Sequence, residues 1–268
     1  MDKVALVTGA TSGIGYATSD ILSKNGFIVY AASRHAIDKN VPPACSPLNL
    51  DVANKASRKS AIAKILKEQG RLDILINNAG YGELGAIEDV DEKDAKSEFE
   101  VNVFGAMALA QLVLPIMRKH EGGRIINVSS IAGRLSAPFH GWYSASKYAI
   151  EALSDAMRLE VEPFGIKVVL VEPGQVKTNW DSIARKSLLD NIKTKDYEKG
   201  AKGVEKYLEK EYEKCAGPDV VAKAILSAAT KKNPKARYPV PASANRLILL
   251  KRFLPEGLFE SLMKRSMD

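Results

Sequence analysis

The sequence is poor in cysteine and histidine, with two residues of the first kind and three of the second. Cys45 and Cys215 lie far apart, and neither belongs to a CxxC pair or to a cluster with histidine. Disulfide frameworks and structural metal sites are recognised by close, regular spacing of such residues. The sequence therefore predicts neither a disulfide nor a metal site.

Long uninterrupted hydrophobic runs are also missing. Charge, glycine or proline breaks each apolar stretch well before the roughly 20 residues needed to cross a bilayer. The N-terminus leads straight into a short apolar strand, without the charged leader and long hydrophobic segment of a signal peptide. No internal repeat or low-complexity tract is present. We therefore expect a cytoplasmic protein.

The positive charge is concentrated at the C-terminal end. The chain has 268 residues, 46% of them hydrophobic, and a formal net charge of +7. Residues 231–268 contain nine Lys or Arg and three Asp or Glu, so the rest of the chain is nearly neutral. Without a recognisable nucleic-acid-reading element, this distribution does not favour nucleic-acid binding. Length and composition predict a single domain, residues 1–268, with a substantial core and a basic C-terminal segment, 231–268.

A glycine-rich turn follows the first predicted strand, residues 4–8. A helix of about residues 14–25 comes next, so backbone N–H groups and the positive end of the helix can face a pyrophosphate. A turn that merely links a strand to a helix is the alternative. The residues predicted to contact a dinucleotide here are Gly9, Thr11, Ser12, Gly13, Ile14 and Gly15.

The second predicted strand, residues 26–34, ends at Ser33 and Arg34. A carboxylate at this position typically binds the ribose 2′-hydroxyl of NAD, whereas a cation accepts the 2′-phosphate of NADP. Because no acidic residue occurs between Ser33 and Asp38 and a guanidinium binds phosphate with paired hydrogen bonds, NADP is favoured over NAD. The alternative is that Arg34 is an ordinary surface residue.

An acid–base group is indicated by Tyr143 and Lys147, which lie four residues apart, and by Ser130 at the end of an apolar strand. In a helix, i,i+4 spacing puts phenol and ammonium on one face. A neighbouring cation lowers the pKa of a phenol, so we expect Lys147 to bring Tyr143 toward the working range of an acid–base catalyst. Alone, the pair would also fit a solvated helix face, and Ser130 would fit a cap.

These residues belong to a longer series that resembles the short-chain dehydrogenases/reductases over about residues 3–180. The matching positions are Thr8, Gly9, Gly13 and Gly15; Asp51; Asn77, Asn78, Ala79 and Gly80; Asn102; Ser130; Tyr143 and Lys147; and Pro173, Gly174 and Thr178. The resemblance implies a single-domain α/β Rossmann-type fold, a doubly wound parallel sheet of about seven strands with helices on both faces.

The resemblance also implies roles for individual residues. Ser130, Tyr143 and Lys147 are expected to be catalytic, and the counterpart of Asn102 bends its helix, about residues 95–119, and holds a water in a proton path. Plain structural support is an equal alternative for Asn102. Besides the glycine turn, Ser33 and Arg34, the implied cofactor-binding residues are Asp51, Val52, Asn78, Ala79, Gly80, Tyr143, Lys147, Pro173, Gly174, Val176 and Thr178.

A helix of about residues 143–164 carries an apolar stripe that includes Ala149, Leu153 and Leu159. Such a stripe fits a core or a subunit interface. In the family this helix commonly pairs across a two-fold axis, together with the Asn102 helix. The resemblance therefore implies a homodimer or homotetramer.

Two segments lie outside the motifs that the chain shares with the family. Residues 180–215 are helix-prone and highly charged, and we expect a mobile lid over the substrate with Trp180 and Leu189 as apolar wall residues, or else an inert insertion. The amphipathic, basic residues 245–265 are expected to close the substrate pocket, pack in an oligomer or rest on anionic lipid. Core or interface packing is favoured over peripheral membrane contact.

The sequence thus predicts an NADP-dependent oxidoreductase that interconverts a hydrophobic ketone or aldehyde and its alcohol. In reduction, Tyr143 protonates the carbonyl oxygen, Ser130 polarises it, and Lys147 holds the cofactor ribose. The alternatives are an NAD-dependent alcohol dehydrogenase of the same fold, a non-catalytic dinucleotide-sensing module and, least favoured, a nucleic-acid binder.

Overall fold

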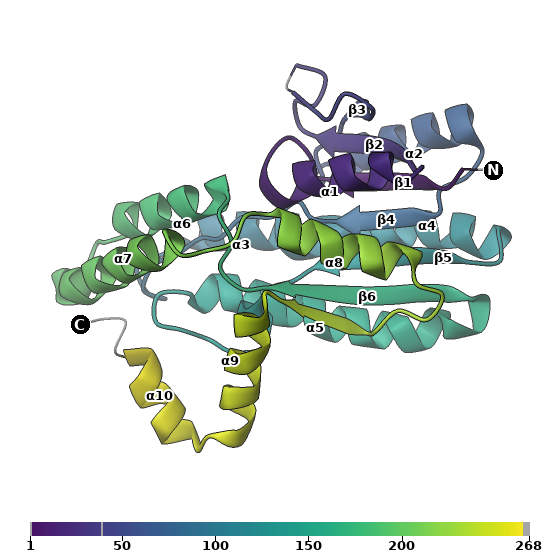
Figure 1. Cartoon of the computed structure of the whole chain (residues 1–268). Coiled ribbons are helices and arrows are strands. Elements are labelled where there is room, and N and C mark those ends of the chain that lie inside the picture. The colour runs from purple at the N-terminus through teal and green to yellow at the C-terminus, as the bar shows by residue number, and fades with distance from the viewer. Residues whose placement is uncertain (1, 39, 265–268) are drawn as a thin grey trace.

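The protein is built around one parallel sheet (Figure 1). The computed structural model describes residues 2–38 and 40–264, and within them seven strands pair in the order β3-β2-β1-β4-β5-β6-β7. The predicted Rossmann-type fold is therefore confirmed. The strands are β1 (Val4–Thr8), β2 (Ile28–Ser33), β3 (Ser46–Asn49), β4 (Ile74–Asn77), β5 (Gly123–Val128), β6 (Ile166–Pro173) and β7 (Arg237–Val240).

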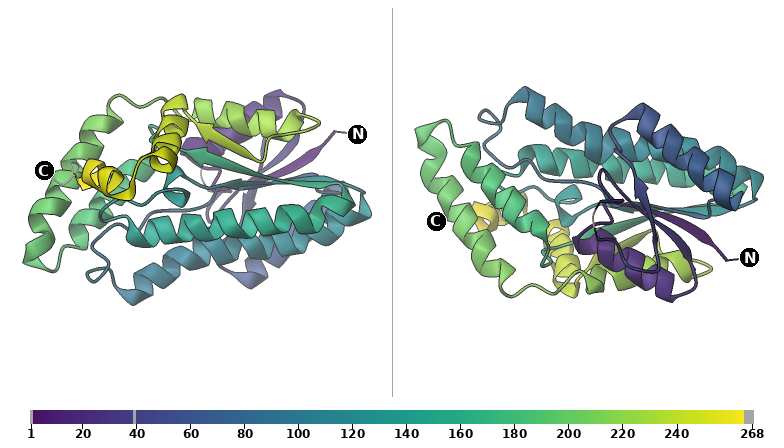
Figure 2. Two further views of the ribbon diagram at one scale, coloured as in Figure 1. Left: turned by 90° about the horizontal axis from the view of Figure 1, so that it is seen from below. Right: turned by 90° about the horizontal axis from the view of Figure 1, so that it is seen from above.

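Helices cover both faces of the sheet (Figure 2). On one face lie α1 (Gly13–Lys24) and α8 (Asp219–Thr230), and on the other α2 (Lys55–Gln69), α4 (Ala106–Lys119) and α5 (Gly141–Val161). All residues of β1 are buried, as expected of a central parallel strand that packs against helices on both sides. Two separate apolar cores result, one on each face of the sheet.

The strand order reverses direction between β1 and β4. In doubly wound sheets, ligands bind at such a switch point, outside the carboxyl ends of the strands. The glycine turn after β1 and the turn 78–80 after β4 both lie at this edge. The fold therefore places the first two predicted cofactor segments side by side.

The predicted helix over residues 95–119 is longer and less regular than expected. It consists of α3 (Glu92–Phe99), a π-helical turn η1 (Glu100–Gly105) and α4. Within the described residues, this stretch, Glu92–Lys119, has the length and hydropathy of a membrane-spanning helix, contrary to our expectation. Its inward residues, among them Leu109 and Val113, pack in the core beneath the sheet, so it is a core helix of the fold.

Four of the helices that follow β6 form two pairs that project from the sheet. The first pair is α6 (Asn179–Asp190) and α7 (Glu198–Tyr212), joined through the short 3-10 helix η4 (Lys195–Tyr197). The second, α9 (Ala242–Phe253) and α10 (Glu256–Lys264), is the predicted C-terminal helix broken at Pro255. Figure 1 shows these pairs in green and yellow on the side away from the N-terminus. Residues 265–268 of the predicted basic segment lie outside the described residues.

Candidate active site

The turn after β1 requires glycine at three positions. Gly9 and Gly13 have φ angles of +67° and +52°, in the left-handed region that favours glycine. A Cβ atom on Gly15 would lie 2.1 Å from the carbonyl oxygen of Gly9. The start of α1 therefore packs directly on the turn. Ser12 stands at the N-cap of α1 without a side-chain hydrogen bond.

The turns after β1 and β4 are tied together by Thr8. Its Oγ1 accepts hydrogen bonds from the backbone N–H groups of Asn78 and Ala79, each at 3.0 Å. The Asn78 side chain donates to the carbonyl oxygen of Thr8 at 2.9 Å. Asn78 thus supports the sheet edge, while the turn borders the switch point.

The end of β2 combines a buried hydroxyl with an exposed cation. Ser33 Oγ is buried and has no hydrogen-bond partner in the protein. The next residue, Arg34, is exposed, and none of the described carboxylates forms an ion pair with it. A buried polar atom without a partner is rare. This edge therefore offers one unsatisfied hydroxyl and one available guanidinium to a ligand.

Asp51 and Val52 lie in the neighbouring turn. The Asp51 carboxylate accepts a hydrogen bond from the N–H of Ala53 at 3.0 Å. The carbonyl oxygen of Val52 approaches η1 so closely that a Cβ on Gly105 would lie 2.7 Å from it. The turn that carries Val52 is therefore packed against the helical turn that carries Asn102.

Ser130, Tyr143 and Lys147 meet at the carboxyl end of β5. Each side chain is nearly buried, with 9%, 7% and 7% of its surface exposed. The Lys147 ammonium donates to the carbonyl oxygen of Val128 at 3.1 Å and lies 5.7 Å from the centre of the Tyr143 ring. Ser130 Oγ accepts the N–H of Ala132 at 3.1 Å, so it also caps the 3-10 helix η2 (Ile131–Gly133). The fold thus brings the three predicted catalytic residues together.

The acid–base properties of this group differ from our expectation. Burial raises the pKa of Tyr143, a hydrogen bond with Ser130 opposes that rise, and the Glu98 carboxylate adds to it. Burial lowers the pKa of Lys147 to about 8, against the attraction of Glu98 and Glu151. In the protein chain itself, burial outweighs the hydrogen bond with Ser130, so the pKa of Tyr143 lies above its ordinary value. The effect of Lys147 on this pKa stays a prediction.

Asn102 lies in η1 and uses its whole side chain within the protein. Its Nδ2 donates to the carbonyl oxygen of Tyr81 at 2.8 Å, and its Oδ1 accepts the N–H of the same residue at 3.1 Å. A Cβ on Gly80 would lie 2.8 Å from Asn102 Oδ1 and 3.6 Å from Lys147 Nζ. Asn102 therefore fixes the turn 80–81 beside the lysine, and the π-helical turn is the expected local distortion of its helix.

The segment after β6 returns to the glycine turn. A Cβ on Gly13 would lie 3.2 Å from the Thr178 side chain. Thr178 Oγ1 accepts the N–H of Trp180 at 3.3 Å and caps α6. Before it, Pro173 ends β6 and the N–H of Gly174 donates to the carbonyl oxygen of Val240 at 2.7 Å, while Val176 packs against the α1–α8 core.

The helices α6 and α7 cover Tyr143 with an apolar layer. The rings of Trp180 and Tyr143 lie 5.1 Å apart, and Gly82 packs so closely that a Cβ there would meet Trp180 at 2.6 Å. Leu188 is fully buried, whereas Leu189 is 42% exposed. The predicted wall residue Trp180 thus faces the site, but Leu188 replaces Leu189, because positions 180, 184 and 188 share one helix face.

Sequence reasoning missed two residues of this site, Glu98 and Ser146. Glu98 Oε1 accepts hydrogen bonds from Asn102 Nδ2 and from Ser146 Oγ, both at 3.1 Å. Glu98 precedes Asn102 by four residues, and Ser146 lies next to Lys147. The i,i+4 spacing was the available signal, but Glu98 belongs to a run of acidic residues in which only burial sets it apart.

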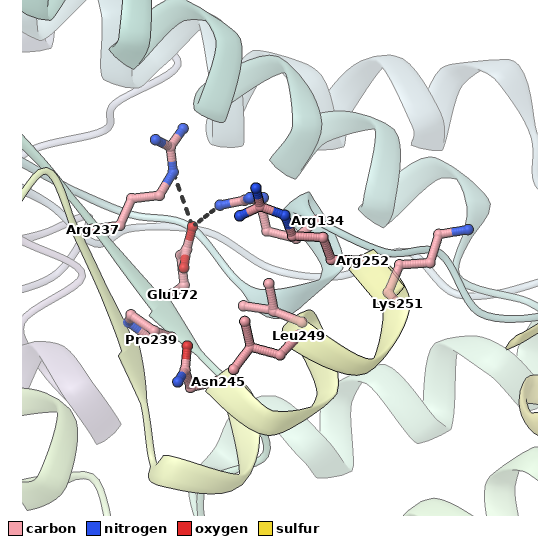
Figure 3. A pocket seen from close by; sticks show the side chains of 9 residues that line it. Arg134, Glu172, Arg237, Pro239, Asn245, Leu249, Lys251 and Arg252 are labelled. Atoms are coloured by element: carbon pink, nitrogen blue, oxygen red, sulfur yellow. Dashed lines mark hydrogen bonds and ion pairs between the residues drawn. The ribbon is translucent and has the colours of Figure 1, made fainter. Parts of the chain in front are cut away.

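A second polar cluster lies at the edge of the sheet (Figure 3). The buried carboxylate of Glu172 forms ion pairs with Arg134 at 3.0 Å and with Arg237 at 3.2 Å. These pairs join β6, β7 and the loop that follows Ser130. A cavity of about 530 Å³ between this cluster and α9 is bordered by Leu249 and Arg252 and by no predicted site residue. The cluster supports the strand edge next to the site.

Two predicted features remain, the apolar stripe of α5 and the two cysteines. On α5, Leu153 and Leu159 are 41% and 73% exposed, whereas Ala149 packs against a buried cluster, so only the outer part of the apolar stripe lies outside the core. Cys45 and Cys215 are both free thiols.

Comparison with known proteins agrees with this geometry. The short chain dehydrogenase family profile matches residues 3–188. A probable short-chain type dehydrogenase/reductase, VdlC of Helicobacter pylori, is 37% identical over 266 residues, 97% of this chain and 96% of its own length. The 3-ketodihydrosphingosine reductase of Bacteroides thetaiotaomicron is 38% identical over 263 residues, 98% of this chain and 97% of its own. The chain therefore belongs to the short-chain dehydrogenases/reductases.

Solved structures show the same architecture. A short-chain dehydrogenase from Streptomyces avermitilis superposes with a TM-score of 0.80 at 30% identity, covering 98% of this chain and 94% of its own. A Burkholderia cenocepacia short chain dehydrogenase in complex with NADP gives 0.74 at 25% identity, covering 97% of both chains. A Burkholderia phymatum protein in complex with NAD gives 0.78 at 23%, covering 94% and 93%. The chain is thus an NAD(P)-dependent oxidoreductase of carbonyl and alcohol groups.

Proposed function

We propose that this protein is an NADP-dependent reductase of hydrophobic ketones or aldehydes, which also catalyses the reverse oxidation. The main observation is that Ser130, Tyr143 and Lys147 are nearly buried together beneath an apolar layer, at the sheet edge that carries the glycine turn. A carbonyl group in this place would meet a hydroxyl donor and a phenol, the groups that general acid catalysis needs.

The residues present fit a dinucleotide. Gly9 and Gly13 hold the turn after β1 in the left-handed conformation, and the hydroxyl of Ser33, at the carboxyl end of the neighbouring strand β2, has no partner in the protein. We assign the pyrophosphate to residues 9–15, the adenosine to the turns of Asp51 and Asn78, and the nicotinamide end to residues 173–178. When bound, the reduced cofactor supplies the hydride.

The chain's own groups act on the carbonyl oxygen. Ser130 donates a hydrogen bond that holds the oxygen, and Tyr143 transfers its phenolic proton to it as hydride reaches the carbon. The charge of Lys147 favours the phenolate that remains and orients the cofactor ribose. Asn102 fixes the turn beside Lys147. In alcohol oxidation the same groups act in reverse.

The preference for NADP rests on the end of β2. Arg34 is exposed and has no carboxylate partner among the described residues, and an arginine can bind the 2′-phosphate through paired hydrogen bonds. No acidic residue lies between β2 and Asp38 to bind a free 2′-hydroxyl.

The hydrophobic character of the substrate is inferred from the layer above Tyr143. Trp180, Leu84, Phe139, Leu188 and Val204 belong to one apolar cluster with the tyrosine. The similar Bacteroides protein is named a 3-ketodihydrosphingosine reductase. We therefore propose α6 and α7, which make up most of residues 180–215, as a lid that excludes water from an apolar substrate.

The proposal includes assembly and location. The exposed stripe of α5 would be buried in a homodimer or homotetramer, as the family resemblance implies. We place the protein in the cytoplasm.

The proposal is tested by cofactor titration followed by a substrate panel. NADPH should quench intrinsic fluorescence at lower concentration than NADH. Cofactor consumption is then recorded with 3-ketodihydrosphingosine, other hydrophobic ketones, aldehydes of increasing chain length and small polar carbonyls. Faster turnover of the hydrophobic members supports the proposal. Cofactor binding without turnover of any carbonyl would instead support the dinucleotide-sensing module.

A further inference from the structure

A buried carboxyl group lies directly behind the candidate active site. Glu98, near the end of α3, has no solvent exposure. Its Oε1 accepts hydrogen bonds from Asn102 and Ser146, both at 3.1 Å, and its Oε2 accepts the N–H of Glu83 at 3.3 Å. Three donors around one carboxyl group are the surroundings that stabilise its charged form, whereas burial favours its neutral form.

These opposing effects place the ionisation of Glu98 near neutral pH. Burial raises its pKa to about 7, while the hydrogen bonds from Glu83 and Ser146 and the charge of Lys147 restrain the rise. The carboxylate of Glu83 acts in the opposite direction and favours a proton on Glu98. The side chain therefore changes charge in the range where most enzymes work.

The charge of Glu98 acts on both groups of the acid–base pair. From α5, Lys147 and Tyr143 face it, and the ionised carboxylate raises the pKa of each. Glu151 also raises the pKa of Lys147. From the loop after β4, Tyr81 and Glu83 face it, and Tyr81, with its pKa raised to about 12, stays neutral. Ionised Glu98 thus favours a protonated lysine and a protonated phenol.

We propose that Glu98 is a positioning residue for carbonyl reduction: it holds Asn102 and Ser146 in place, and its negative charge keeps Lys147 and the Tyr143 hydroxyl protonated at alkaline pH. This inference rests on the proposed function, because the Tyr143 proton matters only if it is delivered to a substrate. Glu98 itself touches neither substrate nor cofactor.

The pH dependence of Glu98→Gln tests the proposal. Above about pH 7 the parent has a charged Glu98 and the variant does not. The alkaline limb of kcat/KM for reduction should therefore move to lower pH in the variant, by roughly one pH unit. Below that pH Glu98 is neutral in the parent as well, so the two profiles should run parallel.

Glu100→Gln is the matched control, because Glu100 is exposed and lies two residues further along the same helical stretch. Its profile should coincide with that of the parent. If Glu98→Gln lowers kcat/KM by one constant factor at every pH, the residue supports the fold only, and the proposed effect of its charge is wrong.

A second measurement does not depend on turnover. In protein labelled with ¹³C at the glutamate carboxyl carbons, one resonance should titrate near pH 7 and disappear in both Glu98→Gln and Glu98→Asp. The aspartate variant keeps a carboxyl group and serves if the glutamine variant does not fold. A midpoint in the usual range of glutamate, about 4 to 5, overturns the inference even if reductase activity is found. Absence of reductase activity with a midpoint near 7 would refute the proposed function and leave the ionisation of Glu98 established.

Discussion

Residues 3–178 differ in construction from the helical pairs α6–α7 and α9–α10, which lie within residues 179–264. In the first region, close backbone contacts fix the conformation of the turns and require glycine at certain positions. Examples are the contacts of Gly15 with Gly9 and of Gly105 with Val52. In the helical pairs, α6 and α7 pack an apolar layer over Tyr143, and large hydrophobic residues such as Leu189 and Phe253 remain exposed. The first region tolerates little change, whereas the two helical pairs can vary without disturbing the strands.

This difference in packing indicates that separate parts of the chain would recognise the cofactor and the substrate. Contacts that would hold a dinucleotide come from the carboxyl ends of β1 to β6. The layer that would contact the carbon chain of a substrate comes largely from α6 and α7. Substitutions in the first region should therefore change chemistry and cofactor choice, and those in the second should change stability and substrate affinity.

The largest effect is expected from Tyr143→Phe. Loss of the phenolic proton should reduce kcat by about 10²- to 10⁴-fold, while NADPH still binds, because the substitution removes one oxygen from a buried ring. Tyr148→Phe, on the exposed side of α5, is the control and should retain full activity. Equal turnover of Tyr143→Phe and the parent would remove the tyrosine from the mechanism.

The next prediction compares two adjacent leucines of α6. Leu188 is fully buried and Leu189 is 42% exposed. Leu188→Ala should lower the free energy of unfolding by about 2–5 kcal/mol, and Leu189→Ala by less than about 0.5 kcal/mol. Denaturant unfolding measures both. A similar loss in the two variants would mean that α6 does not hold this orientation on the site.

Arg34→Asp should change cofactor choice without affecting the fold. Loss of a charge-assisted contact of about 1.5–3 kcal/mol weakens NADPH binding by roughly 10- to 100-fold, and NADH binding should change little. Arg246→Asp makes the same change of charge at an exposed position on α9 and should leave both affinities unaltered. An unchanged NADPH/NADH ratio in Arg34→Asp would exclude the proposed phosphate contact.

The smallest effect is expected at the C-terminal pair of helices. Phe253 on α9 is 76% exposed, so Phe253→Ser should change the free energy of unfolding of the monomer by less than about 0.5 kcal/mol. Thermal unfolding at several protein concentrations provides the measurement. A large, concentration-dependent loss of stability would show that α9 is covered by another copy of the chain. The C-terminal helical pair would then be as tightly packed as the first region.

The fold could be predicted from the sequence, and so could the site residues that lie close together along the chain. Thr8, Gly9 and Gly15 could be predicted because a tight turn between a buried strand and a helix tolerates few alternatives. Tyr143 and Lys147 could be predicted because helical spacing alone puts them on one face.

Other features could not be read from the sequence because they depend on three-dimensional packing. The choice between Leu188 and Leu189 follows from where α6 begins, which is set by the cap at Thr178. The raised pKa of Tyr143 follows from burial beneath Trp180 and from Glu98, both brought in from distant segments. Local patterns contain neither the degree of dehydration nor the identity of a distant neighbour.

The π-helical turn at Glu100–Gly105 makes this part of the protein intolerant of changes in length. An α-helix advances by about 100° per residue, so removing one residue from the turn would rotate everything on one side of it relative to the other. Either Asn102 would leave Tyr81, or Leu109 and Val113 would leave the core. Evolution can exchange side chains along this stretch, but it cannot shorten the stretch by a single position and keep both the core and the site.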